Sequence, residues 1–258
     1  MSELFWTESG TGRPLVLLHG GFLHHRMWDD QIPAFAEHFR VIAPDARGHG
    51  RSPNATEPYR LTDDLAALLR HLGTGPAILV GVSMGAATAV DTALEHPDLV
   101  SAVVVTGAGT SEPYFTDPWT TRAWAGWQAA MAAGDLDASV EGHLLFAAGP
   151  HRALDTLDPD VVARLRRMAR ETMSKHAPGE PNHLVPVHDT WERLPAVRVP
   201  VLAINGSLDS PDHLGMADRL TTTVPHGRTH TISGTAHYPN LEQPDAYNKT
   251  LESFLHTL

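Results

Sequence analysis

Short runs of apolar residues alternate with longer amphipathic stretches in the first part of the chain. The apolar runs are near-continuous, and each is followed within two residues by glycine or a polar residue: Pro14–Leu18, Val41–Ala43, Ala77–Val80 and Val100–Thr106. Runs of this kind are typical of strands buried on both faces of a parallel sheet. The alternation therefore predicts an α/β fold, with a mostly parallel central sheet and helices on both faces.

The amphipathic stretches between these runs predict the covering helices. Arg26 to Phe39 has apolar residues at helical spacing, and a second helix extends from Thr62, as its N-cap, to Leu72. A third helix begins beyond the apolar run that ends at Val80 and continues to about Glu95. A sheet with helices on both faces buries its strands completely, in agreement with their apolar character.

The pattern changes at about residue 110. From there to residue 193 no segment has the pattern of a buried strand, and three helices are expected, at about 119–132, 136–147 and 159–176. Strand patterns return at Val199–Asn205 and Thr229–Ile232, followed by a closing amphipathic helix. We therefore expect an α/β core of residues 1–109 and 194–258, interrupted by a helical cap of residues 110–193.

A serine stands at the junction between one predicted strand and the next helix. Gly81-Val82-Ser83-Met84-Gly85 follows the apolar run and precedes a helical segment that begins with small residues. A tight turn there presents the serine hydroxyl above the sheet, and the two glycines prevent a clash between strand and helix. The N-terminus of the helix directs free N–H groups toward a developing oxyanion. The context predicts a nucleophile elbow with Ser83 as the nucleophile.

A serine nucleophile needs a base and a group that orients the base. His237, just after the last predicted strand, is the candidate base, and Asp209, just after the preceding strand, is the candidate acid. Both follow the carboxyl ends of strands, at the edge where Ser83 is also expected. Asp212 is a rival acid and His230 a rival base, although His230 lies within a strand pattern.

The oxyanion needs two N–H donors. Met84 provides one because it follows the nucleophile, and the loop after the first core strand provides the other, from Phe22 or alternatively from Gly21. Further candidate substrate-binding residues are Gly21, Trp124, Trp127, Phe146 and Tyr238. The aromatic residues of the expected cap have the alternative role of packing it on the core.

Four arginines on one expected cap helix form a basic face. They are Arg164, Arg166, Arg167 and Arg170. We interpret this face as solvated surface rather than as a binding site for a substrate carboxylate.

Composition narrows the possible partners and location. The formal net charge of −11, from 19 basic and 30 acidic side chains, argues against nucleic acid or an anionic membrane as partner. No apolar run approaches about 20 residues, and Met1–Phe5 has neither the basic nor the apolar region of a signal peptide. We expect a cytoplasmic protein that acts on a small molecule. The sequence is compatible with a homo-oligomer.

The chain contains no cysteine and 17 histidines. The absence of cysteine excludes disulfides and thiolate chemistry. The histidines are scattered, without metal-ligand spacing, and we interpret His24, His25, His143, His151 and His183 as solvated surface residues. No metal site is expected.

Together these motifs resemble the α/β-hydrolase superfamily. The resemblance covers nearly the whole chain: His-Gly-Gly at 19–21, Asp-x-Arg-Gly-x-Gly-x-Ser at 45–52, the elbow at 81–85, Gly-x-x-Asp at 206–209 and His237. It implies a cofactor-free hydrolase with a helical cap, similar to small esterases, enol-lactonases and cofactor-free perhydrolases. Members commonly begin with two antiparallel strands, but only Leu4–Thr7 is available here, so we expect seven strands instead of eight.

Departures from the patterns of individual subfamilies narrow the range of reactions that the resemblance implies. Dehalogenases and epoxide hydrolases of this superfamily have aspartate as nucleophile, which Ser83 excludes. C–C bond hydrolases usually have Trp where this chain has Tyr238, and perhydrolases often have Gly where it has Ala86.

The expected function is hydrolysis of a small or medium carboxylic ester or lactone through Ser83, His237 and Asp209. Perhydrolysis and C–C bond hydrolysis are alternatives. A ligand receptor with slow or vestigial turnover is an alternative of another class.

Overall fold

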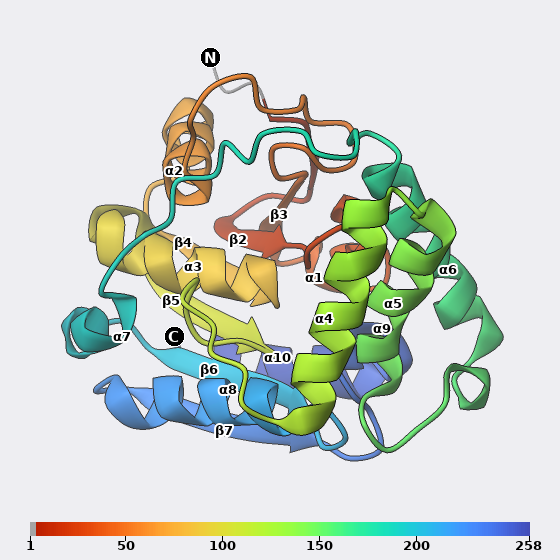
Figure 1. Ribbon diagram of the computed structural model, residues 1–258. Coiled ribbons are helices and arrows are strands. Elements are labelled where there is room, and N and C mark those ends of the chain that lie inside the picture. Colours follow the sequence, from red (N-terminus) through yellow and green to blue (C-terminus); the bar gives the residue numbers. More distant parts are fainter. Residues whose placement is uncertain (1–3) are drawn as a thin grey trace.

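The computed structural model describes residues 4–258 (Figure 1). The expectation that Met1–Phe5 is not part of a signal peptide concerns Met1, Ser2 and Glu3, which lie outside the described residues. Seven strands form one sheet in the order β1-β3-β2-β4-β5-β6-β7. β1 pairs antiparallel with β3, and every other neighbouring pair is parallel. The strands are β1 (Trp6–Ser9), β2 (Arg13–Leu18), β3 (Phe39–Pro44), β4 (Ala77–Val82), β5 (Val100–Thr106), β6 (Val201–Gly206) and β7 (Gly227–Ile232).

The seven-stranded sheet confirms the expectation of one short antiparallel strand at the beginning of the chain. Trp6 pairs with Pro44 and Ser9 with Val41, so β1 lies on the edge of the sheet beside β3. In the part of the chain that the structure describes, residues 110–193 contribute no strand to this sheet. Their one β-bridge joins Leu184 to Tyr59, apart from the sheet.

Complete burial of the central strands accounts for their continuous apolar sequence. Successive side chains of a strand point to opposite faces, and in β2 Leu15 and Leu17 join one buried cluster while Val16 and Leu18 join the other. Both faces of the sheet are therefore covered by apolar cores.

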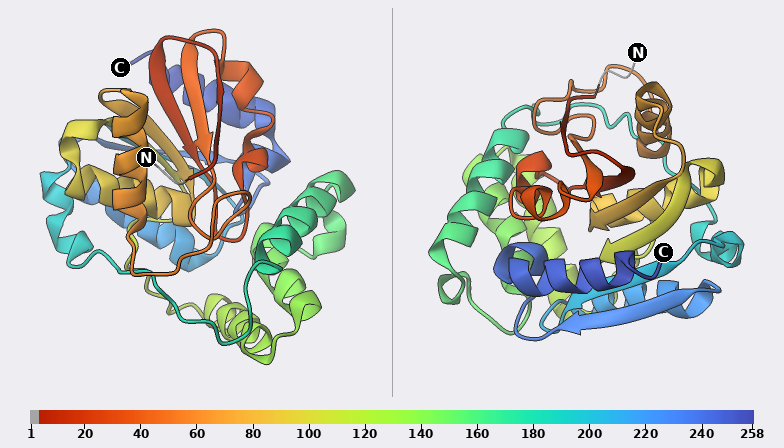
Figure 2. Two further views of the ribbon diagram at one scale, coloured as in Figure 1. Left: turned by 90° about the horizontal axis from the view of Figure 1, so that it is seen from above. Right: turned by 180° about the vertical axis from the view of Figure 1, so that it is seen from behind.

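Helices provide the second layer of both cores (Figure 1). Their bounds are α1 (Ile32–Phe35), α2 (Leu61–Leu72), α3 (Met84–Glu95), α4 (Pro118–Ala133), α5 (Leu136–Ala148), α6 (Pro159–Met173), α7 (Thr190–Arg193), α8 (Pro211–Thr223), α9 (Pro239–Glu242) and α10 (Pro244–Leu255). Apolar residues of α2, α3 and α8 pack on one face of the sheet, and those of α10 pack on the other. Figure 2 shows α4, α5 and α6 together beyond one end of the sheet. None of the helices within residues 4–258 is long and apolar enough to span a membrane.

Two local predictions were wrong. The helix expected from Arg26 to Phe39 is instead the 3-10 turn His25–Trp28 followed by α1, and Phe39 already begins β3. Pro33 lies in the first turn of α1, the part of a helix that tolerates its missing N–H, and it would interrupt a continuous helix.

The second error concerns Thr62, which was expected to cap α2. Arg60 is the N-cap, and Thr62 lies inside the first turn. The Thr62 side chain is buried, and its hydroxyl has no hydrogen-bond partner among the described residues.

Candidate functional site

Ser83 lies on a strained turn between β4 and α3. Its φ of 53° is in the left-handed region, which residues other than glycine rarely occupy. The Ser83 N–H donates to the Thr106 carbonyl of β5 at 2.8 Å, which ties the turn to the neighbouring strand. The structure therefore places Ser83 as the elbow motif predicts, at the carboxyl edge of the sheet.

The two flanking glycines are required by close backbone contacts. A Cβ on Gly81 would lie 2.3 Å from the Gly85 carbonyl carbon, and a Cβ on Gly85 would lie 2.2 Å from the Leu18 carbonyl oxygen. Because the obstructing atoms belong to the backbone of a central strand and of α3, no side-chain rotation relieves either clash.

Replacing Gly85 by alanine is therefore expected to destabilise the fold by about 3 kcal/mol, because strand and helix must separate. Gly126→Ala in α4 is the matched control, since its added methyl group meets nothing within 4 Å. It should leave stability unchanged or raise it by up to about 1 kcal/mol through helix propensity. Urea unfolding compares the two variants, and equal stabilities would contradict the packing argument.

Asp209 and His237 form the expected hydrogen-bonded pair. His237 Nδ1 lies 2.8 Å from Asp209 Oδ2, and both side chains are almost fully buried. Although burial favours the neutral carboxyl, His237 and His213 hold the pKa of Asp209 well below its usual range. An ionised Asp209 accepts a hydrogen bond from the Nδ1–H of His237, which leaves His237 Nε2 as the acceptor nitrogen.

The rival acid and base lie elsewhere in the structure. Asp212 accepts hydrogen bonds from the backbone N–H groups of Thr116 and Asp117, each at 3.0 Å, and from the Thr116 hydroxyl. Its carboxylate thus anchors the chain that leads into α4. His230 lies on the edge strand β7 with its side chain exposed.

A cavity of about 390 Å³ lies in front of Ser83 and His237. Its wall includes every residue expected to bind substrate or the oxyanion: Gly21, Phe22, Met84, Trp124, Trp127, Phe146 and Tyr238. The Trp124 and Trp127 rings lie 5.0 Å apart, and Phe22 contacts Trp127 at a ring distance of 5.1 Å. The aromatic side chains therefore border the cavity and also pack against one another.

The expected oxyanion donors have free N–H groups. Phe22 has a φ of 58°, on a turn in which the Leu23 N–H donates to the Gly20 carbonyl. Met84 begins α3, where the first N–H groups have no partner within the helix. Within residues 4–258, neither the Phe22 nor the Met84 N–H has a hydrogen-bond acceptor, so both are available to an oxyanion in the cavity.

His213 is a neighbour of the pair that the sequence analysis missed. It lies in the first turn of α8 with Nδ1 3.2 Å from Asp209 Oδ1 and 2.9 Å from the Ser210 hydroxyl. Its ring centroid is 4.4 Å from that of His237. Burial lowers the pKa of His213, which favours its neutral form. The four-residue spacing from Asp209 was the available signal, since residues i and i+4 face the same side of a helical turn.

His143 is also part of this site, and its interpretation as a solvated surface residue was wrong. It lies on α5 and borders the cavity, with Nε2 3.3 Å from the Tyr238 hydroxyl. Burial lowers the pKa of His143 to about 4. The error arose because the opposite wall of the cavity belongs to segments remote in sequence, which shield one side of α5.

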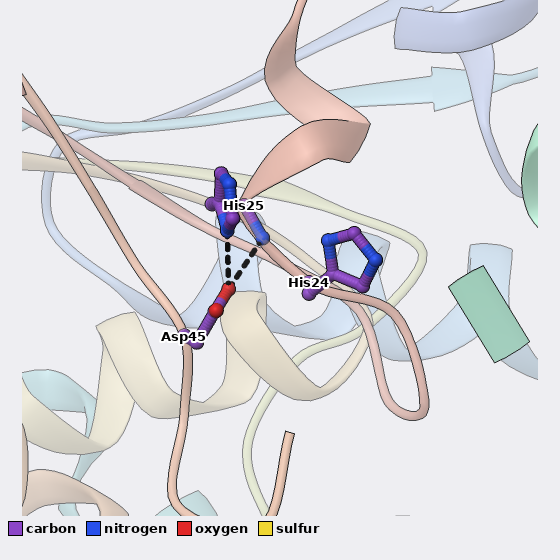
Figure 3. A group of neighbouring side chains, drawn as sticks. All are labelled: His24, His25 and Asp45. Carbon is purple, nitrogen blue, oxygen red and sulfur yellow. Dashed lines mark hydrogen bonds and ion pairs between the residues drawn. The ribbon is translucent and has the colours of Figure 1, made fainter. Parts of the chain in front are cut away.

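A second cluster contains His24, His25 and Asp45 (Figure 3). Here too the surface interpretation was wrong for His24, which is 4% exposed. These side chains have the residue types and proximity of a metal site. Their ligand atoms are already engaged, however. Asp45 Oδ1 accepts from the His25 N–H and ring, Asp45 Oδ2 accepts from the Arg51 N–H, and His24 pairs with Glu171.

The cluster holds the turn after β3 in place. Burial opposes ionisation of Asp45, but the hydrogen bonds from His25 and Arg51 outweigh it and lower the pKa of Asp45 to about 2. A Cβ on Gly50 would lie 2.3 Å from Asp45 Oδ2. The cluster therefore fits a structural role in the loop that follows β3.

The basic face of α6 is largely neutralised by carboxylates. Arg164 pairs with Asp30 at 2.6 Å, Arg166 pairs with Glu141 at 2.6 Å, and Arg170 pairs with Asp137. These pairs join α6 to α5 and to the core. They favour a structural role for the arginines over recognition of a substrate carboxylate.

Comparisons with known proteins agree with this geometry. The family model described as alpha/beta hydrolase fold matches residues 13–244. The chain is 28% identical over 259 residues to a pimeloyl-(acyl-carrier protein) methyl ester esterase of Vibrio atlanticus, covering 97% of each protein. It is similar to an enol-lactonase structure from Burkholderia xenovorans, with a TM-score of 0.76 and 25% identity over 98% of this chain and 96% of that one. A bromoperoxidase from Bacillus anthracis has a TM-score of 0.79, with 25% identity over 98% of this chain and 95% of that one.

Proposed function

Because the chain belongs to the α/β-hydrolase fold family, we propose that it is a serine hydrolase that cleaves a small or medium carboxylic ester or lactone. The observation that carries the proposal is the 2.8 Å hydrogen bond from His237 to Asp209 beside the cavity that Ser83 also borders. The similarity of this chain to a methyl ester esterase and to an enol-lactonase structure supports the same reaction class.

The reaction begins with attack of the Ser83 hydroxyl on the substrate carbonyl. His237 Nε2 takes the hydroxyl proton, and Asp209 holds the imidazole in the tautomer that makes Nε2 the acceptor. The N–H groups of Phe22 and Met84 stabilise the negative oxygen of the tetrahedral intermediate. These roles use the free N–H groups and the buried ionised carboxylate that the site contains.

Release of the first product and hydrolysis of the acyl-enzyme complete the cycle. The imidazolium of His237 returns its proton to the alcohol oxygen, the carbon–oxygen bond breaks, and the acyl group stays on Ser83. Water then attacks the acyl-enzyme with His237 again as base, which yields the carboxylic acid and free Ser83. In a lactone the leaving alcohol remains attached to the product.

Perhydrolysis is the second candidate, favoured by the similarity to the bromoperoxidase structure. In that reaction a carboxylic acid acylates Ser83 with loss of water, and hydrogen peroxide in place of water releases a peracid. The same serine, histidine and aspartate serve both reactions. The two functions therefore differ in the molecule that enters the cavity in the second half of the cycle.

A panel of esters and lactones of graded size, assayed with and without hydrogen peroxide, tests the proposal. We expect repeated turnover of at least one ester or lactone class without peroxide. Preferential formation of peracid would instead support perhydrolysis. A single turnover followed by a stall would contradict both and support a ligand receptor with vestigial chemistry.

A further inference from the structure

Two polar side chains on the wall of the cavity lack hydrogen-bond partners. Among residues 4–258, the two carboxylate oxygens of Asp91 have no hydrogen-bond partner, and the hydroxyl of Thr62 has none either. Asp91 is 1% exposed and Thr62 is 2% exposed, yet both border the cavity that also contains Ser83. Buried polar groups are normally satisfied, so unpartnered groups at a cavity point to a bound molecule that supplies the missing partner.

Asp91 lies on α3, the helix that begins directly after the nucleophile. Ser83 is the N-cap of α3, Ala87 and Asp91 follow it at four-residue spacing, and all three border the cavity. Eight residues of helix separate Ser83 from Asp91 by about 12 Å. Side chains lean toward the N-terminus of their helix, so the Asp91 carboxyl leans toward Ser83.

The surroundings of Asp91 disfavour an isolated negative charge. Burial is the main cause that raises its pKa to about 6, and Glu112 and Glu95 act in the same direction. The hydroxyl and the backbone N–H of Ser111 lie near the carboxylate and favour its ionised form, but neither has the distance and angle of a formed hydrogen bond to it. An adjacent cation would remove this penalty, because an opposite charge stabilises a buried carboxylate.

We propose that Asp91 and Thr62 bind a primary ammonium group carried by the substrate, about 10 Å from the carbonyl that Ser83 attacks. This inference rests on the proposed function and adds the substrate class. An ammonium has three N–H donors, which match the two oxygens of Asp91 and the hydroxyl of Thr62. The rest of the substrate lies along a largely apolar wall that includes Ala87, Pro113 and Val187.

The proposed contact distinguishes substrates by the group at their far end. An ω-amino ester gains a charge-assisted hydrogen bond at Asp91. A methyl-terminated ester leaves the carboxylate unpaired, and an ω-carboxy ester places a second negative charge beside it. Among straight-chain methyl esters of matched length, kcat/KM is therefore expected to be highest for the ω-amino ester, intermediate for the methyl-terminated ester and lowest for the ω-carboxy ester.

Asp91→Asn tests the contact with little change in shape. Wild type should prefer the ω-amino over the methyl-terminated ester by about 10-fold or more, and Asp91→Asn should reduce this ratio to near one. Asp98→Asn is the matched control, because Asp98 is exposed on the turn after α3 and its removal changes the net charge equally. An amino preference retained by Asp91→Asn, or lost equally in Asp98→Asn, would overturn the proposal.

Calorimetric binding to Ser83→Ala separates this inference from the proposed function. A straight-chain alkylamine should bind at least 10-fold more tightly than the alcohol of equal length, whether or not the wild-type protein turns over any ester. Equal binding of amine and alcohol would refute the ammonium site even if ester hydrolysis is confirmed. Unfolding curves verify that each variant is folded.

The same binding measurement has an expected pH dependence. Asp91 is ionised above pH 6 and protonated below it, so amine affinity should fall as the pH is lowered through about 6. Glu95 and Glu112 are the charged groups that face Asp91, and Glu95 is paired with Arg60 and Arg193 while Glu112 accepts hydrogen bonds from Asp189 and Thr190. Asp91→Asn retains these groups and the cavity histidines, so a fall of equal size in that variant would assign the effect to them and contradict the role of Asp91.

Discussion

Ser83→Ala is expected to abolish turnover, with a loss of about 10⁴-fold or more in kcat. Without the hydroxyl no acyl-enzyme forms, and only binding and oxyanion stabilisation remain to accelerate attack by water. A fluorophosphonate probe should label wild type at Ser83 and leave Ser83→Ala unlabelled. Intact-protein mass spectrometry measures the labelling, and steady-state kinetics on the best ester of the panel measures turnover.

The control for this experiment is a serine far from the cavity. Ser253 is exposed on α10, where its hydroxyl donates to the Lys249 carbonyl. Ser253→Ala should therefore be labelled and active like wild type. Full activity in Ser83→Ala, or labelling at a different serine, would show that the elbow does not carry the nucleophile.

Asp209→Asn is expected to lower kcat by about 10⁴-fold while the fold is retained. An amide oxygen and nitrogen in place of the carboxylate favour the wrong tautomer of His237 and do not stabilise the imidazolium that forms in the transition state. Because the substitution is made behind the imidazole, away from the substrate, KM should change much less than kcat. The measurement is a comparison of kcat and KM for one ester across the variants.

Asp212→Asn is the matched control, three residues along the chain. Its carboxylate anchors Thr116 and Asp117, so the variant should be less stable than wild type. Its kcat should fall by less than about 10-fold. A severe loss in Asp212→Asn together with a mild effect in Asp209→Asn would reverse the assignment of the acid. A serine mechanism would survive that result with a different orienting group.

The fold was largely predictable from sequence because its strongest signals are local. A strand buried on both faces must be largely apolar. β4 has no polar side chain, β2 has none after Arg13, and β5 has only Ser101 and Thr106. The turn at Ser83 was predictable because two backbone contacts permit only glycine at positions 81 and 85. These constraints act within a few residues and are visible in one sequence.

The parts of the site that were missed depend on neighbours far along the chain. His143 is enclosed because Tyr238 and Phe22, which are remote in sequence, contact its ring. The residues that flank His143 in the chain give no sign of these contacts. Asp91 lies in α3, whose residues from Gly85 to Ala93 are all buried, and its isolation follows from the residues that surround it in space. Thr62 was assigned to a cap because a threonine before an apolar helix usually has that role.

The cavity has two walls of different origin, and this has a consequence for protein engineering. Ser83, Asp209 and His237 belong to segments that emerge from the sheet, whereas Trp124, Trp127 and Phe146 face them from α4 and α5. A mutant library confined to α4 and α5 can therefore reshape the pocket while the reacting groups keep their backbone supports. Directed evolution toward bulkier esters should find most of its beneficial substitutions in α4 and α5. The segments at the sheet edge should tolerate few substitutions.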